Sequence, residues 1–102
     1  MYTLQKTNHF INWLLGLKDL KARARIQIQL TRMEQGNLGD HKSVGDGVFE
    51  IRISYGPGYR LYYSNQGNVI KLLLIGGDKS TQEKDIQKAK TLLKEIENEN
   101  AG

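Results

Sequence analysis

The sequence contains no cysteine, which excludes a disulfide, a cysteine-ligated metal ion and a cysteine nucleophile. No run of apolar residues approaches the ~18 that a membrane-spanning helix needs. The first residues also lack the charged and apolar regions of a secretory signal peptide. Without disulfides, a small domain depends on helices that pack well against a sheet. We therefore expect a cytoplasmic protein with no membrane partner.

The length of 102 residues allows one domain with one core, and we expect a single domain over residues 1–102. A hydrophobic content of 38% with 25% charged residues is typical of a folded globular protein. The first sixty residues hold nine Lys and Arg against five Asp and Glu, and the rest hold six of each. This basic excess is compatible with a phosphate-bearing or an acidic partner, and charge alone does not choose between them.

Two helices are predicted in the first third of the chain. Thr7 or Asn8 can cap the first, because apolar residues follow at helical spacing, at Phe10, Trp13, Leu14 and Leu17. Asp19 can cap the second, which runs past Leu30. Alternation between Ala22 and Leu30 would also suit a strand, but the Ala, Arg, Gln and Leu content favours a helix. Two helices in close succession predict a helical hairpin.

The middle of the chain predicts strands. A short strand is expected near residues 2–6. Four glycines with Asn and Asp predict a loop over residues 35–47. Alternating apolar and polar residues over 49–55 predict a strand, Gly56-Pro57-Gly58 a hairpin turn, and 59–64 the returning strand. The apolar run over 69–75 predicts a buried strand that ends at Gly76-Gly77.

A last helix is expected after a capping box at Ser80-Thr81-Gln82-Glu83. Its apolar stripe contains Ile86, Ala89, Leu93 and Ile96. The predicted fold class is therefore α+β: an N-terminal strand and a helical hairpin packed on an antiparallel meander sheet, with a C-terminal helix.

Four charged residues are expected to gather on this sheet. Glu50 and Arg52 lie two positions apart and share a face of their strand, and the hairpin returns Arg60 beside them. Lys79 follows the last strand. Arginine binds phosphate through two hydrogen bonds, so such a cluster would stabilise a phosphoryl-transfer transition state. The alternative is that Glu50 and Arg52 form a surface ion pair and that Arg60 is a strand-edge charge.

Other residues give weaker signals. His41, beside Lys42 in the glycine-rich segment, could reach a substrate, but two histidines without ligand spacing do not predict a metal site. No Walker-type loop, dinucleotide fingerprint or Ser/His/Asp arrangement is present.

Several motifs occur in an order that resembles a known family. These are Val48-Phe49-Glu50-Ile51-Arg52-Ile53, Gly58-Tyr59-Arg60-Leu61-Tyr62-Tyr63 and Gly76-Gly77-Asp78-Lys79-Ser80-Thr81-Gln82. The combination resembles the RelE/ParE toxin superfamily, and within it the HigB-like addiction module killer proteins. The resemblance covers nearly the whole chain and implies a RelE-like β-α-α-β-β-β-α order.

The resemblance implies the toxin of a type II toxin–antitoxin system. RelE-type toxins enter the ribosome and cut mRNA by attack of a ribose 2′-hydroxyl, without a metal or other cofactor, and so inhibit translation and arrest growth. The expected partners are the ribosome, mRNA and a cognate antitoxin, often one with a helix-turn-helix DNA-binding domain. Operator DNA would be contacted only through that antitoxin.

The resemblance also implies residue roles. Arg60 matches the arginine on the scissile phosphate, Arg52 a basic residue on the preceding strand, and Lys79 an arginine that supports the leaving group. Glu50 is the hypothetical general base, and Tyr62 is a weaker candidate. Lys42, His41 and Tyr62 are candidate substrate-binding residues.

The sequence departs from the family pattern at the residues that move protons. RelE has a lysine in place of Glu50 and a tyrosine in place of Asp85, and the histidine that HigB enzymes often carry near the last strand is absent. The proton-transfer pair therefore stays open. An alternative is a ParE-like, non-enzymatic inhibitor of DNA gyrase, although Arg52, Arg60 and Lys79 favour the nuclease. A third possibility is a degenerate member that only binds its antitoxin.

Overall fold

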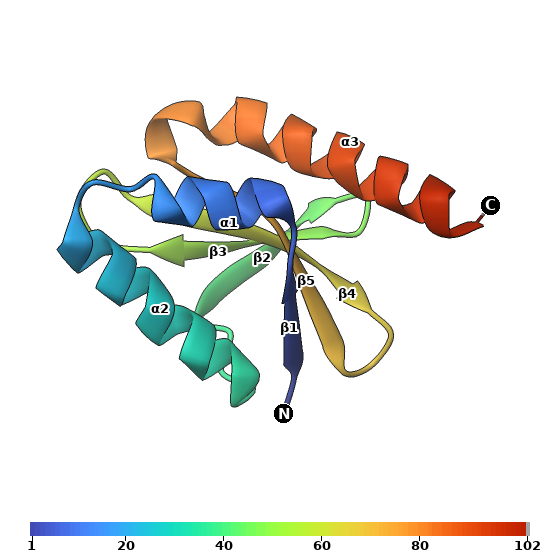
Figure 1. Cartoon of the computed structure of the whole chain (residues 1–102), viewed down its shortest axis with the longest axis horizontal. Helices are drawn as coiled ribbons and strands as arrows, with labels where there is room; N and C mark the ends of the chain where they lie inside the picture. The colour runs from blue at the N-terminus through green and yellow to red at the C-terminus, as the bar shows by residue number, and fades with distance from the viewer. Residues whose placement is uncertain (102) are drawn as a thin grey trace.

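A five-stranded mixed sheet in the order β1-β5-β4-β3-β2 forms the centre of the fold (Figure 1). The computed structural model describes residues 1–101. Its strands are β1 (Thr3–Lys6), β2 (Asp40–Gly45), β3 (Val48–Ile53), β4 (Tyr59–Gln66) and β5 (Ile70–Asp78). Its helices are α1 (Asn8–Leu15), α2 (Leu20–Glu34) and α3 (Gln82–Ala101), with a short 3-10 turn, η1, at Lys79–Thr81. The predicted α+β class is confirmed.

The glycine-rich segment contains a strand, so the prediction of a loop over residues 35–47 is wrong. β2 pairs with β3 in antiparallel register, with Lys42 opposite Glu50 and Asp40 opposite Arg52. Five of the six residues of β2 are exposed, so the strand shows none of the apolar alternation by which strands are recognised. The meander therefore has four strands, β2 to β5.

The sheet is also not purely antiparallel. β1 pairs with β5 in parallel, with Thr3 opposite Ile70 and Lys6 opposite Leu73. A parallel pair needs a long crossover, and α1, α2 and the rest of the meander supply it. The first strand thus occupies the sheet edge next to the last strand.

The helices α1 and α2 cover one face of the sheet. Thr7 caps α1 by accepting a hydrogen bond from the Phe10 backbone amide, and Asp19 caps α2 in the same way. Both predicted caps are confirmed. The two helices are joined by residues 16–19 and diverge from this link (Figure 1). Their apolar residues share one core with side chains of the sheet, among them Phe10, Ile26, Leu30, Leu61 and Leu73.

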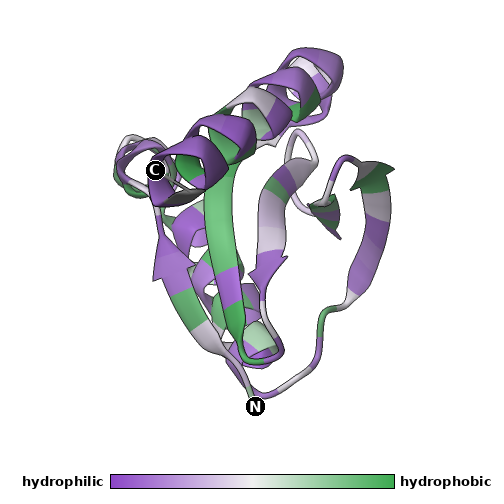
Figure 2. Cartoon of the chain, turned by 90° about the vertical axis from the view of Figure 1, so that its right-hand side faces the viewer, coloured by the Kyte–Doolittle hydropathy of each residue, from purple (hydrophilic) through white to green (hydrophobic). Residues whose placement is uncertain are grey.

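The helix α3 covers the opposite face. Ala89 and Leu93 pack with Val48, Tyr62 and Leu74 in a second core. Figure 2 shows β5, which contributes to both cores, as hydrophobic over most of its length. None of the helices within residues 1–101 is long and apolar enough to span a membrane.

Gly76 and Gly77 do not end the last strand, as the sequence predicted; β5 continues to Asp78. They instead allow close packing on both faces. A Cβ at Gly76 would overlap the Trp13 ring at 2.1 Å, and a Cβ at Gly77 would meet the Asp85 carboxylate at 1.9 Å. Trp13 is accordingly a packing residue of the first core.

The predicted capping box, with a hydroxyl of Ser80 as the cap, is not the cap that the structure shows before α3. Asp78 caps the 3-10 turn, because its carboxylate accepts hydrogen bonds from the backbone amide and the hydroxyl of Ser80. Thr81 donates its hydroxyl to Asp85 at 2.6 Å. The first turn of α3, which follows, brings Gln82 to Glu50 on β3 and Asp85 to Gly77 on β5.

Candidate functional site

A buried carboxylate lies at the centre of the candidate site. Glu50 on β3 has no exposed surface. Its oxygens accept hydrogen bonds from Arg52 Nε at 3.1 Å, Tyr62 Oη at 3.2 Å and Gln82 Nε2 at 2.8 Å. We call Glu50, Arg52, Arg60, Tyr62 and Gln82 the Glu50 cluster.

Arg60 completes this cluster from β4. It lies opposite Arg52 in the β3–β4 register. Its Nε is 3.7 Å from Glu50 Oε2, within ion-pair range but too long for a hydrogen bond. In the part of the chain that the structure describes, this buried Nε has no hydrogen-bond partner. The Nη1 group donates to the Gly58 carbonyl at 3.2 Å. Arg60 is therefore held in the sheet and is only 8% exposed.

Lys79 stands beside Arg60. The position that a Cβ at Gly58 would occupy lies 3.5 Å from Arg60 Nη1 and 3.6 Å from the Lys79 Cβ. The Lys79 backbone amide also donates to the Gly58 carbonyl at 2.9 Å. The Gly56-Pro57-Gly58 turn therefore brings Lys79 next to the cluster, and Lys79 itself is exposed.

The surroundings of Glu50 keep it charged. Burial alone would raise its pKa, but the hydrogen bonds from Gln82, Arg52 and Tyr62, together with the Arg52 charge, outweigh burial and lower the pKa below its ordinary value. Burial and the neighbouring Glu50 carboxylate raise the pKa of Tyr62. The Tyr62 hydroxyl therefore stays protonated at neutral pH and acts as a hydrogen-bond donor.

The two candidate substrate-binding residues on β2, Lys42 and His41, lie on different faces of the sheet. Lys42 is paired with Glu50 and so shares its face, whereas His41 is paired with Ile51 on the other face. Both are exposed. His41 Nδ1 lies 3.0 Å from the Gly39 carbonyl. The structure thus places Lys42 on the side of the Glu50 cluster and His41 away from it.

Sequence reasoning gave no role to Gln82 or Asp85. Gln82 donates to Glu50, and Asp85 is buried at 8% exposure between Gly77 and the Thr81 hydroxyl. Both sit in the first turn of α3, where a local pattern shows only polar residues after a cap. The glycine at position 77 was the available signal, because a glycine in a strand often marks a close approach.

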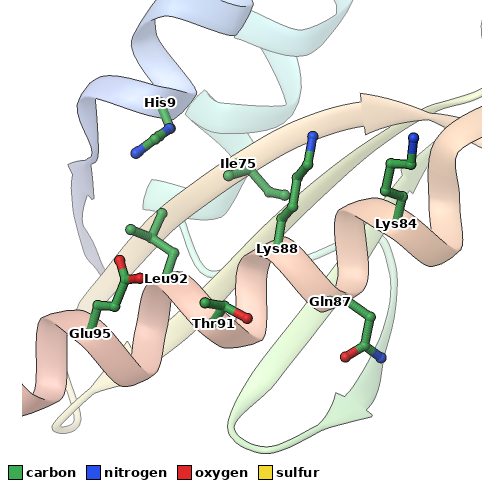
Figure 3. Close-up of a pocket in the computed structure, with 8 residues that line it drawn as sticks. All are labelled: His9, Ile75, Lys84, Gln87, Lys88, Thr91, Leu92 and Glu95. Atoms are coloured by element: carbon green, nitrogen blue, oxygen red, sulfur yellow. The ribbon is translucent and has the colours of Figure 1, made fainter.

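One cavity lies away from this cluster. It is a groove of about 500 Å³ between α1, β5 and α3, whose walls include His9, Ile75, Lys88 and Leu92 (Figure 3). A polar cavity of about 490 Å³ is lined by Lys79 and the following residues to Lys84. Within residues 1–101, no three His, Asp or Glu side chains gather in a group that could hold a metal ion.

A relative of this chain is found in Haemophilus influenzae. The two sequences are 52% identical over 93 residues, which cover 91% of this chain and 94% of that protein, described as an uncharacterized protein. The chain belongs to the family of this Haemophilus protein. No protein-family model matches the chain. The description of the Haemophilus relative gives no activity, so the resemblance to RelE/ParE toxins stays a prediction.

The arrangement of the cluster limits what each group can do. Arg52 is 38% exposed at its side chain and Lys79 is exposed, so these two can meet an anion at the surface. Arg60 is 8% exposed and offers an anion little accessible surface. Glu50 has all its polar contacts inside the protein, which suits a residue that orients two arginines.

Proposed function

We propose that this chain is the toxin of a type II toxin–antitoxin system, with a RelE-like fold, and that it cuts mRNA on the ribosome in the cytoplasm. The supporting observation is that Arg52 and Arg60, paired across the β3–β4 hairpin, lie at the same end of the sheet as Lys79, which follows β5. Arg52 and Arg60 both contact Glu50, and the Arg60 guanidinium and the Lys79 backbone both donate to the Gly58 carbonyl. A phosphodiester at this place would meet positive charge from two strands and a turn.

In the proposed reaction, a ribose 2′-oxygen bonds to the adjacent phosphorus and the bond to the 5′-oxygen breaks. Arg60 and Arg52 stabilise the negative charge that grows on the phosphate oxygens, and Lys79 stabilises the leaving oxygen. The substrate is RNA because the attacking group is the 2′-hydroxyl. This scheme uses residues of the chain alone.

The geometry favours a positioning role for Glu50 over that of general base. A base must reach the proton that it removes, and Glu50 has no exposed surface and a lowered pKa. We therefore propose that Glu50 positions the arginines, and the residue that accepts the 2′-hydroxyl proton is left unassigned.

The test is primer extension on a reporter mRNA after expression of the wild type, Arg60→Ala and Lys79→Ala. We expect cuts with the wild type and a loss of about 100-fold with each variant, as for removal of one donor to a transition-state oxyanion. Arg23→Ala, on α2, is the control with the same charge change. Lys79 is exposed, so its variant keeps the test valid if Arg60→Ala unfolds. Equal cutting by Lys79→Ala and the wild type would refute the assigned site.

The same cells test the proposed partner. An antitoxin, proposed to carry a helix-turn-helix domain that alone contacts operator DNA, should restore growth when it is expressed together with the toxin. Absence of any growth arrest by the wild type would instead indicate a degenerate member.

One observation favours a second candidate, a ParE-like inhibitor of DNA gyrase. Arg52 and Arg60 are already engaged by Glu50, and Arg60 is nearly buried, so the cluster is partly closed to a phosphate. An inhibitor that only binds gyrase would need no phosphate inside the cluster and could use the exposed surface of the protein alone. Pulse labelling distinguishes the two: protein synthesis stops first for the nuclease, and DNA synthesis stops first for the gyrase inhibitor.

A further inference from the structure

A second group of arginines lies around a cleft between α2 and β3. The cleft has a volume of about 300 Å³. Arg25, Gln29 and Arg32 line it from α2, and Arg52 lines it from β3. Arg52 is opposite Asp40, the first residue of β2, so the cleft opens where β3 continues past the edge strand. We call this site the arginine cleft.

Two of the three arginines around the cleft have no ion-pair partner within residues 1–101. None of the residues that line it is acidic. Among residues 1–101, neither Arg25 nor Arg32 has a carboxylate within ion-pair distance. Arg52 does have one, because its Nε binds Glu50. The cleft thus concentrates positive charge that an incoming anion would balance.

Two of the guanidinium groups are held in place before any ligand arrives. The Arg25 guanidinium carbon lies 5.1 Å from the centre of the Tyr55 ring. Tyr55 in turn donates its hydroxyl to Asp19, the cap of α2. Arg52 is fixed by Glu50 from the other side. Ordering these side chains in advance reduces the entropy that a ligand would otherwise have to remove.

Gln29 supplies a second sign of a missing ligand. It is only 8% exposed, and its Nε2 is a buried donor without a hydrogen-bond partner among residues 1–101. Its amide packs against Gly39, where an added Cβ would approach to 3.3 Å. Buried donors in folded proteins are nearly always paired. Because Gln29 also lines the cleft, a small rotation of its amide would offer this donor to an anionic oxygen bound there.

We propose that the arginine cleft binds the phosphodiester backbone of a single-stranded polynucleotide. Arg25 and Arg32 are seven residues apart on α2, about 10 Å along the helix axis, a spacing that suits an extended polyanion with several charges. Ile28 lies between them and is 49% exposed, which offers an apolar contact to a sugar or base. The site goes beyond the proposed function, because binding here does not require cleavage.

The experiment measures binding of a fluorescent single-stranded RNA 12-mer by anisotropy over a range of salt concentrations. Arg32→Gln should weaken binding about tenfold at low salt, the loss of one charge-assisted contact. The slope of log K against log salt should fall by about 0.7, the value for one phosphate on a single strand. Arg32 is exposed, so we expect the variant to keep the melting temperature of the wild type.

Arg23→Gln is the matched control. It makes the same charge change on the same helix, and Arg23 lies nine residues before Arg32, about half a turn away around the axis. We expect its affinity to change less than twofold, within general electrostatics. Equal losses in the two variants would show that only net charge matters and would overturn the proposal.

Two further probes separate the sources of the anion. A DNA 12-mer of the same sequence that binds with the same dependence on Arg32 supports the phosphodiester site without a preference for RNA. A poly-glutamate of equal charge that shows the same dependence would overturn it in favour of an acidic protein. Failure of the wild type to bind either nucleic acid would also refute it. RNA binding without mRNA cuts in cells would retain this site and reject the nuclease.

Discussion

Glu50 and Lys71 are both buried ionisable residues of the same sheet, but their surroundings differ. Glu50 accepts three side-chain hydrogen bonds and has two arginines within ion-pair range. Lys71 donates to Asn65 and lies 4.0 Å from the Tyr2 ring centre and 5.3 Å from that of Tyr63. Within residues 1–101 it has no carboxylate partner.

The two pKa values reflect this difference. Burial opposes the charge of both groups, yet the pKa of Glu50 is lowered because its partners outweigh burial, which favours the charged form. The pKa of Lys71 is lowered by burial, which favours the neutral form. Only the surroundings of Glu50 are organised around a charge. Loss of Glu50 should therefore leave uncompensated cations behind, whereas loss of the Lys71 charge should not.

The largest effect is expected for Glu50→Ala. Removing one partner of a buried ion pair leaves the other charged and desolvated, so we expect the free energy of unfolding to fall by about 3–5 kcal/mol. Urea denaturation followed by the fluorescence of Trp13, the single tryptophan, measures this. Glu50→Gln keeps the shape and part of the hydrogen bonding, and should lose less. A loss under about 1 kcal/mol for Glu50→Ala would mean that the arginines turn out to solvent at little cost.

A smaller effect is expected from acid. The pKa of Glu50 is lower in the folded than in the unfolded protein, so the unfolded state binds more protons in acid. The stability contributed by Glu50 is present above the ordinary carboxyl pKa of about 4.3 and is lost as the pH falls towards the folded value. Urea midpoints between pH 6 and pH 3 should therefore fall more steeply for the wild type than for Glu50→Gln. Parallel curves would contradict the charged state assigned to Glu50.

Much of the fold followed from local patterns. Caps at Thr7 and Asp19, the Gly56-Pro57-Gly58 turn and the apolar stripe of α3 each involve residues close together in sequence, and each was predicted. The turn also fixed the register that sets Arg52 opposite Arg60. Neighbouring residues determine such features, so a single sequence suffices.

The errors arose where distant segments decide the structure. β2 lies at an exposed edge and carries no apolar alternation, so the glycines around it suggested a loop. The parallel pairing of β1 with β5 joins segments nearly seventy residues apart and leaves no local trace. Gln82 was missed for the same reason, since only the packing of α3 on the sheet brings it to Glu50.

The smallest effect is expected for Lys71→Met, which tests the other side of the comparison. The variant loses a cation–π contact of about 0.5–2 kcal/mol and a hydrogen bond of about 1 kcal/mol. It gains a buried apolar chain and avoids the desolvation of an ammonium group, so the net change should stay within about 1 kcal/mol. The same urea titration at pH 7 gives the value. Asn65 is exposed, and water can replace its lost donor.

The dependence of stability on pH tests the lowered pKa of Lys71 more directly than the titration at pH 7. A lowered pKa means that folded Lys71 binds fewer protons than unfolded Lys71, so its contribution to stability increases as the pH rises towards about 10.4. Lys71→Met should lack this rise. This rise should be measured below about pH 10. Burial raises the pKa of Tyr63 to about 12, so above about pH 10 the tyrosine ionises in the unfolded state before it does so in the folded state, and stability is lost. Lys71→Met could instead lose as much unfolding free energy as Glu50→Ala. The aromatic rings and the Asn65 amide would then stabilise a buried charge as well as two arginines do, and the proposed difference between the two sites would be wrong.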